Sequence, residues 1–311
     1  MMSKWNNLMH IYESLEYRLY RYTFGKVFFK RRYDKIKECN IYSIKETAEE
    51  LANTNKSIGR YGDGELSWML GKNNGFNNFE KRSKKLSDRL LEVFQSDRKD
   101  FIVTLPDGFR KESFDDFTSG SRKYWEYYIT KKANKIYKLF DKDRKYFNTS
   151  VTRPYIDYNS NEYAKDSFSS IRKVWENKKV LIVEGNQSRL GYNDDLFNDC
   201  DDIKRIECPA TNAFESYDQI LNKTLSFLND NENYITLISL GPTATILAYD
   251  LCCNGHRALD IGHIDVEYEW YLIGAKEKIN LPDKYVNEVF DGKEPENLVD
   301  KSKDDEIIYK F

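Results

Sequence analysis

Short apolar runs alternate with longer amphipathic segments through the second half of the chain, and this alternation limits the fold more than any other feature of the sequence. The apolar runs have the length of buried strands, and the segments between them repeat their apolar residues at helical spacing. The expected strands are residues 180–184, 203–208, 234–240 and 257–261, and the expected helices are residues 162–175, 213–228 and 243–253. Strands that alternate with helices form a parallel sheet covered on both faces. The sequence therefore predicts a Rossmann-like α/β fold with a mostly parallel, doubly wound sheet.

The first half of the chain continues the pattern. Ser43 is followed three residues later by Glu46, and this capping box predicts that a helix begins there. Further strands are expected at residues 56–61, 101–105 and 147–151, and further helices at residues 79–94 and 124–140. Residues 107–120 form a polar stretch with three phenylalanines, and a connection of this length could serve as a lid or an acceptor-binding loop.

No low-complexity linker or internal repeat divides the 311 residues, so we expect one domain over residues 43–290 with an extension at each end. Residues 1–42 combine aromatic and basic side chains, which predicts an amphipathic helical arm. Through residues 1–40 such an arm could lie on an anionic membrane surface, dock on a partner, or pack on its own domain with its charges in water. Residues 291–311 are polar and acidic, and we expect a loosely held tail.

Two carboxylates one residue apart, Asp63 and Glu65, alternate with Gly62 and Gly64 directly after an expected strand. Glycine lets the main chain approach a ligand closely, so a carboxylate between glycines can turn toward a group that also contacts the backbone. One or two carboxylates are the usual protein ligands of Mn²⁺ or Mg²⁺ when substrate phosphates complete the coordination. We therefore expect Asp63 and Glu65 to be catalytic metal ligands, with Gly62 and the planar fork of Arg60 at the substrate. A solvated acidic turn is the alternative.

Three further candidates lie close to expected strand ends, where open α/β sheets bind ligands. Thr243 follows Pro242 at an expected helix start, where its hydroxyl and the helix amides would face an anion. Arg189 lies in a polar loop after a strand. Arg153 precedes Pro154, which forces Arg153 out of the helical region and could aim it into the cleft. The alternatives are an unoccupied turn at Thr243 and a polar surface loop at Arg189.

A histidine and several carboxylates follow the last expected strand. In an active site, His263 or Asp265 could accept the proton of an attacking hydroxyl group. Alternatively, Asp265 and Glu267 cap a helix N-terminus while His263 packs its ring. If Asp63 and Glu65 do not hold a metal, residues 260–269 are the next candidates for its ligands.

Several blocks of the sequence resemble, in order, those of the GT-D type glycosyltransferases, a bacterial family. The first is Arg60-Tyr-Gly-Asp-Gly-Glu-Leu66, and the others are residues 184–197, 205–214, 239–244 and 259–270. The resemblance extends over residues 55–275. It implies a nucleotide-sugar-dependent transferase with an Asp-x-Glu metal motif on a Rossmann-like sheet. It also implies a nucleoside diphosphate sugar, with UDP as the carrier, and a glycan or glycoconjugate acceptor.

Charge and composition exclude several other classes. The formal net charge is −2, whereas a general nucleic-acid binder would be strongly basic. Neither a Gly-x-Gly-x-x-Gly nor a P-loop motif is present. The five cysteines form no Cys-x-x-Cys pair, and no apolar run of about eighteen residues occurs. We therefore expect a cytoplasmic protein, which the arm could hold at the inner face of the membrane. The remaining alternatives are a non-catalytic nucleotide-sugar or polysaccharide-assembly binding protein and a metal-dependent phosphohydrolase.

Overall fold

The structure is a computed structural model of the chain, and it describes residues 29–30, 33–34, 39–71, 80–81, 83–110, 112–289, 292, 295 and 302–311. Most of the expected arm at residues 1–42 lies outside these residues. Two of its described aromatic residues pack onto the domain, because the rings of Phe29 and Tyr33 lie 5.4 and 5.2 Å from the ring of Phe114. Tyr33 is buried, so this part of the arm contributes to the core.

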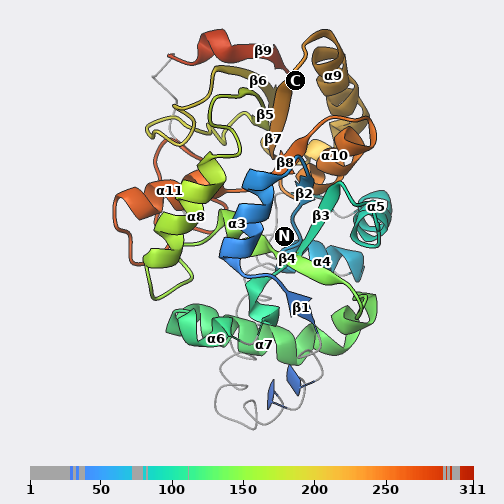
Figure 1. Ribbon diagram of the computed structural model, residues 1–311, viewed down its shortest axis with the longest axis vertical. Coiled ribbons are helices and arrows are strands. Elements are labelled where there is room, and N and C mark those ends of the chain that lie inside the picture. The colour runs from blue at the N-terminus through green and yellow to red at the C-terminus, as the bar shows by residue number, and fades with distance from the viewer. Residues whose placement is uncertain are drawn as a thin grey trace, which may run out of the picture.

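Nine strands in the described residues form one sheet, in which every neighbouring pair is parallel (Figure 1). The strand order is β1-β4-β3-β2-β8-β7-β5-β6-β9. The strands are Asn40–Ile41 (β1), Ser57–Gly59 (β2), Phe101–Leu105 (β3), Lys145–Asn148 (β4), Lys179–Gly185 (β5), Asp202–Cys208 (β6), Tyr234–Ser239 (β7), Ala258–Asp260 (β8) and Ile307–Lys310 (β9). The predicted α/β fold with a parallel sheet is confirmed.

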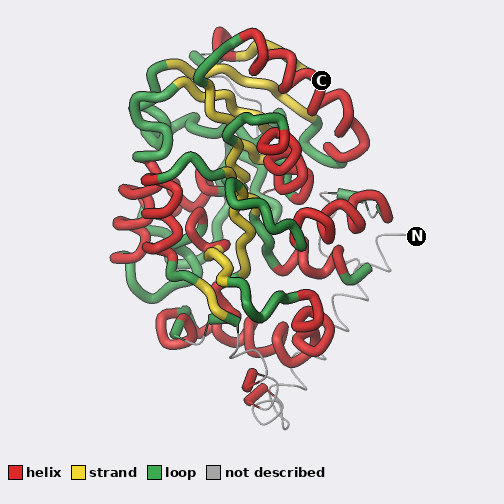
Figure 2. The backbone as a smooth tube through the Cα atoms, turned by 45° about the vertical axis from the view of Figure 1, so that its right-hand side comes forward, coloured by secondary structure: helices red, strands yellow, loops and turns green. Residues whose placement is uncertain are grey.

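Helices cover both faces of the sheet, and the strands run between them (Figure 2). Strand β5 shows the division: Leu181 and Val183 belong to one core, whereas Val180 and Ile182 belong to the other. The first core includes residues of α4 (Asp63–Met69), α5 (Lys84–Phe94), α7 (Ser119–Ile136), α9 (Tyr217–Asp230) and α10 (Pro242–Cys253), and the second includes residues of α3 (Ile44–Asn53), α8 (Glu162–Arg172) and α11 (Ile264–Leu272). None of the helices in the described ranges has both the length and the apolar run needed to cross a bilayer.

Local signals fix where two of these helices begin. The hydroxyl of Ser43 accepts from the N–H of Glu46 at 3.1 Å, and the carboxylate of Glu46 accepts from the N–H of Ser43 at 2.7 Å. This is the predicted capping box of α3. Pro242 occupies the first turn of α10, where its missing N–H leaves no hydrogen bond unmade.

Residues 107–120 differ from the expected polar loop. They form a 3₁₀ turn at Asp107–Phe109, the short helix α6 (Ser113–Asp116) and the start of α7. Phe109, Phe114 and Phe117 are all buried. Three buried rings hold this segment against the domain, so the expectation of a polar loop is wrong, while a role as a lid or in acceptor binding stays a prediction.

The C-terminal end also differs from the expectation of a loose tail over residues 291–311. Ile307–Lys310 form β9, which pairs in parallel with β6 at the edge of the sheet. Glu306 precedes this strand and accepts from Nε of Arg205 at 2.6 Å, and Arg205 is 1% exposed. The run Ile307-Ile-Tyr-Lys310 is too short to predict a strand, but the ion pair between buried Arg205 and Glu306 fastens this segment to the domain.

Candidate active site

The carboxyl ends of β2 and β8 place Arg60 beside Asp260. These strands are neighbours, with Ile58 opposite Leu259. The main-chain N–H of Arg60 donates to Oδ2 of Asp260 at 3.2 Å, and Nη1 of Arg60 lies 3.8 Å from Oδ1. The hydroxyl of Thr245 donates to the same carboxylate at 2.7 Å. Asp260 is buried, and Arg60 supplies the positive charge beside it.

Asp63 and Glu65 lie in the first turn of α4, just beyond the end of β2. Glu65 folds back so that its Oε2 accepts from the N–H of Gly62 at 2.8 Å. A Cβ atom on Gly62 would lie 3.0 Å from this oxygen, so glycine makes room for the carboxylate. Oδ2 of Asp63 accepts from the hydroxyl of Tyr124 on α7. The two predicted metal ligands therefore share one helical turn at the ligand-binding edge of the sheet.

Negative charge accumulates around Glu65. Burial, together with the charges of Asp260 and Asp63, raises the pKa of Glu65 to about 7. A divalent cation would relieve this repulsion, and carboxylate oxygens are the ligands that Mn²⁺ and Mg²⁺ take in proteins. Asp63 and Glu65 have the donor chemistry that such an ion takes, and they are the residues that would hold it.

His263 precedes α11, on the loop that leaves the carboxyl end of β8. Burial lowers the pKa of His263 to about 4, and the positive charges of Arg153 and Arg60 act in the same direction, against the opposing charge of Glu288. The imidazole is therefore neutral at pH 7. A neutral imidazole can accept a proton, so the predicted role of a base is chemically open to His263.

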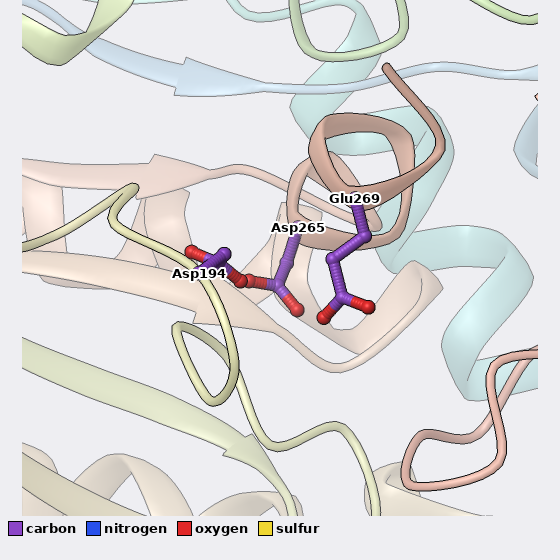
Figure 3. A group of neighbouring side chains, drawn as sticks. All are labelled: Asp194, Asp265 and Glu269. Carbon is purple, nitrogen blue, oxygen red and sulfur yellow. The ribbon is translucent and has the colours of Figure 1, made fainter. Parts of the chain in front are cut away.

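Asp265 has a different environment from the one expected of a catalytic base. Its Oδ1 accepts from the N–H of Gly191 at 2.7 Å, and its Oδ2 is ion-paired with Lys284. Figure 3 shows Asp265 beside Asp194 and Glu269, whose carboxylate oxygens all lie within 4.8 Å of one another. These three carboxylates could hold a metal by their spacing, but the ammonium of Lys284 contacts each of them. The buried lysine supplies the cation, so we assign Asp265 to this buried cluster.

Arg153 is held by carboxylates rather than open to a phosphate. Its Nε lies 3.2 Å from Oε1 of Glu267, and its two terminal nitrogens bind the two oxygens of Glu288. Glu267 also accepts from the N–H of Ile156 at 3.2 Å, and no side chain caps the start of α11, so the alternative that Glu267 caps this helix is wrong. Arg153 was predicted to point toward a ligand. Its guanidinium instead binds the carboxylates of Glu267 and Glu288.

Thr243 and Arg189 are also engaged. The hydroxyl of Thr243 donates to Oε2 of Glu80 at 3.1 Å, and the N–H of Phe214 donates to the same oxygen at 3.2 Å. The anion that Thr243 contacts is thus a carboxylate of the protein itself. Nη1 of Arg189 donates to the main-chain oxygen of Asp283, which ties two loops together. Neither contact was foreseen, because each joins residues far apart in the sequence.

Asp260 was predicted only as part of residues 260–269, the second choice for metal ligands, and Tyr124 was not predicted at all. Asp260 had a usable signal, since it ends an apolar strand at the same edge as Asp63. Tyr124 had none, because one tyrosine among 23 in the chain does not reveal that it faces a carboxylate.

Comparisons with known proteins agree with the fold. The sequence profile of the family described as "Glycosyltransferase GT-D fold" matches residues 58–289. The chain is 32% identical over 271 residues to "Glycosyltransferase GlyD" of Streptococcus pneumoniae serotype 4, covering 87% of this chain and 32% of the relative. It is 31% identical over 273 residues to "Probable glycosyl transferase Gly" of Streptococcus gordonii, covering 88% of this chain and 39% of the relative. The chain thus spans well under half the length of either protein.

Solved structures share the fold along almost their whole length. One is described by the words "The highly conserved domain of unknown function 1792 has a distinct glycosyltransferase fold", with a TM-score of 0.83 and 33% identity, covering 91% of this chain and 99% of that one. Another, "A New Glycosyltransferase (DUF1792) from Streptococcus sanguinis", has a TM-score of 0.79 and 32% identity, covering 88% of this chain and 99% of that one. The chain therefore belongs to the family of glycosyltransferases with the GT-D fold.

Proposed function

We propose that the chain is a metal-dependent glycosyltransferase that moves a sugar from a nucleoside diphosphate sugar to a hydroxyl of a glycan or glycoconjugate. UDP is the proposed carrier, and Mn²⁺ or Mg²⁺ is the proposed metal. The observation that carries the proposal is the pair Asp63 and Glu65 on one turn at the carboxyl edge of the sheet, next to Arg60 and Asp260. The names of the family and of the curated relatives support the reaction class.

Asp63 and Glu65 would hold the metal, which when bound supplies Lewis-acid stabilisation of the diphosphate leaving group. Arg60 adds a fixed positive charge at the same edge, and its side chain is 12% exposed, so only part of it can meet a ligand. Of the predicted diphosphate ligands we keep Arg60 and Gly62. We leave out Arg153, Arg189 and Thr243, whose side chains bind other groups of the protein.

His263 is the proposed acceptor of the proton from the attacking hydroxyl. Its pKa of about 4 keeps the ring unprotonated at neutral pH, so a nitrogen lone pair is available. A base of low pKa holds the proton weakly, and transfer is therefore favoured only as the hydroxyl loses electron density to the anomeric carbon.

A direct test is a thermal-shift and calorimetric titration of the full chain with UDP plus Mn²⁺, with UDP plus chelator, and with Mn²⁺ alone. We expect a stabilising shift and measurable heat with UDP plus Mn²⁺, and a much smaller effect without metal. No metal-dependent response with any nucleotide would contradict the proposal. A panel of nucleotide sugars then separates the alternatives by their products. A transferase, through transfer or slow hydrolysis of the donor, releases nucleoside diphosphate. A phosphohydrolase that cleaves the diphosphate bridge releases nucleoside monophosphate and sugar 1-phosphate, and a binding protein releases none of these.

Two further proposals concern where the enzyme works. We propose a cytoplasmic protein whose residues 1–40 contact an anionic membrane or a partner. Deleting residues 1–28, which precede the described part of the chain, should leave nucleotide binding intact and abolish sedimentation with vesicles that contain anionic lipid. Equal sedimentation of both forms would remove the membrane contact.

A further inference from the structure

Three side chains on one face of α7 contact the beginning of α4. The hydroxyl of Tyr124 donates to Oδ2 of Asp63. One turn further along, the hydroxyl of Tyr128 donates to the main-chain oxygen of Asp63 at 3.0 Å. Another turn on, Nζ of Lys132 donates to Oγ of Ser67 at 2.8 Å. Residues four apart share a helix face, so α7 presents these three groups together.

These contacts divide into two kinds. Tyr128 and Lys132 bind a main-chain oxygen and a hydroxyl, and they fasten the two helices to each other. Tyr124 instead binds the carboxylate that the proposed function assigns to the metal. Tyr128 is 4% exposed, whereas Tyr124 is 42% exposed, so the second contact lies where a substrate could reach it. The Tyr124 hydroxyl can therefore hold this carboxylate in one orientation at a place that a ligand could reach.

Among the described residues, only the hydroxyl of Tyr124 forms a side-chain hydrogen bond to the carboxylate of Asp63. It binds Oδ2 and fixes the rotation of the carboxylate about its bond to Cβ. The other oxygen, Oδ1, is thereby left for a ligand. Groups that hydrogen-bond to metal ligands orient those ligands, and their loss typically lowers metal affinity by about 10- to 100-fold.

We propose that Tyr124 is a positioning residue of the metal site, whose hydroxyl holds the carboxylate of Asp63 so that Oδ1 faces the metal. This inference rests on the proposed function, which assigns Asp63 to the metal. The tyrosine acts through Asp63, whose carboxylate it binds. We therefore expect loss of the Tyr124 hydroxyl to weaken metal binding itself, apart from any effect on turnover.

The test measures free Mn²⁺ by electron paramagnetic resonance while the full chain is titrated in the presence of UDP. Tyr124→Phe removes the hydroxyl and keeps the ring, so we expect Mn²⁺ to bind about tenfold or more weakly. Two matched variants control for the loss of a tyrosine hydroxyl. Tyr128→Phe removes the bond to the main-chain oxygen of Asp63, and Tyr163→Phe removes a bond of 3.2 Å to Asp116 from a ring that is 40% exposed. Both should bind Mn²⁺ as the parent chain does.

Asp63→Ala makes the outcomes distinguishable. If Asp63→Ala loses Mn²⁺ binding while Tyr124→Phe keeps the parent affinity, the metal assignment stands and the role of Tyr124 is refuted. If Tyr128→Phe weakens Mn²⁺ binding as much as Tyr124→Phe does, the packing of α7 on α4 governs affinity, and the inference is again refuted. If Asp63→Ala binds Mn²⁺ like the parent chain, the proposed metal ligands fail and the role of Tyr124 fails with them.

Discussion

The guanidinium of Arg60 lies directly against the main chain of Gly262, so closely that a Cβ atom on Gly262 would be 1.8 Å from Nη1. Gly262 also has a φ of +50°, a conformation that side chains with a Cβ adopt at an energetic cost. The loop after β8 therefore positions the arginine that follows β2. This contact and the ion pair between the Arg60 guanidinium and Asp260 place the positive charge at the carboxyl edge of the sheet.

Gly262→Ala should displace Arg60 and weaken the metal-dependent binding of UDP. Gly255→Ala is the matched control, because Gly255 has a φ of +84° and no atom within 4 Å of a built Cβ. Both variants carry backbone strain of about 1–2 kcal/mol, but only the first also moves the arginine. Urea unfolding gives the stability of each, and calorimetry gives its affinity for UDP with Mn²⁺. Equal affinities in the two variants would mean that the position of Arg60 does not matter for the diphosphate.

Glu80→Gln should change how stability depends on pH. Burial raises the pKa of Glu80 from 4.5 to about 7, which corresponds to about 3 kcal/mol, and Glu80 is 3% exposed. Between these pH values the folded chain binds more protons at this site than the unfolded chain, so the contribution of Glu80 to stability falls as pH rises from 4.5 to 7. Glutamine keeps an acceptor for Thr243 and has no charge to bury. Relative to the parent, Glu80→Gln should therefore gain stability between pH 5 and pH 8; a constant difference would show that Glu80 ionises normally.

Lys284→Met should destabilise the fold strongly, because it leaves Asp194, Asp265 and Glu269 facing one another without a cation. Removing one partner of a buried ion pair typically costs about 3–5 kcal/mol. Lys276→Met, at an exposed position, should change stability by less than about 0.5 kcal/mol. Burial and the charge of Asp265 raise the pKa of Asp194 to about 7, so this carboxylate takes up a proton readily as the pH falls. Lowering the pH should therefore reduce the loss of stability in Lys284→Met. A loss of under about 1 kcal/mol would mean that the three carboxylates do not need the lysine.

His263→Ala should lower kcat about a hundredfold or more if the imidazole accepts the proton of the acceptor hydroxyl. Because the pKa of His263 is about 4, protonation of His263 should not lower the activity of the parent chain near pH 6.5. His263→Ala should therefore leave the shape of the pH profile around pH 6.5 unchanged. His256→Ala is the control. His256 lies between α10 and β8, where its ring contacts Asn229 of α9, so its loss should leave kcat unchanged. The pH profiles of kcat for all three proteins decide the matter. An unchanged kcat in His263→Ala would assign the proton to another group.

Local sequence signals predicted the elements well, and long-range contacts explain what they missed. The capping box at Ser43 and the buried strand at residues 101–105 depend on neighbouring residues, and both are confirmed. The glycine-flanked carboxylates were placed correctly after β2 because the strand end is itself a local signal. Thr243 was expected to face a ligand, but its partner Glu80 lies 163 residues away in sequence. The partners of Asp265 and Arg153 are likewise set by how separate loops meet, which one sequence does not reveal.

In the proposed function, Asp63 and Glu65 hold a metal that the donor needs for binding. Calorimetric titration of UDP in the presence of Mn²⁺ tests it most directly, with the parent chain, Asp63→Ala, Glu65→Ala and the control Asp218→Ala, which removes an exposed aspartate from the first turn of α9. We expect the first two variants to lose metal-dependent binding, with turnover at least about a hundredfold lower and folding little changed, while the control behaves like the parent. Near-parental Mn²⁺-dependent binding in both Asp63→Ala and Glu65→Ala would contradict the account.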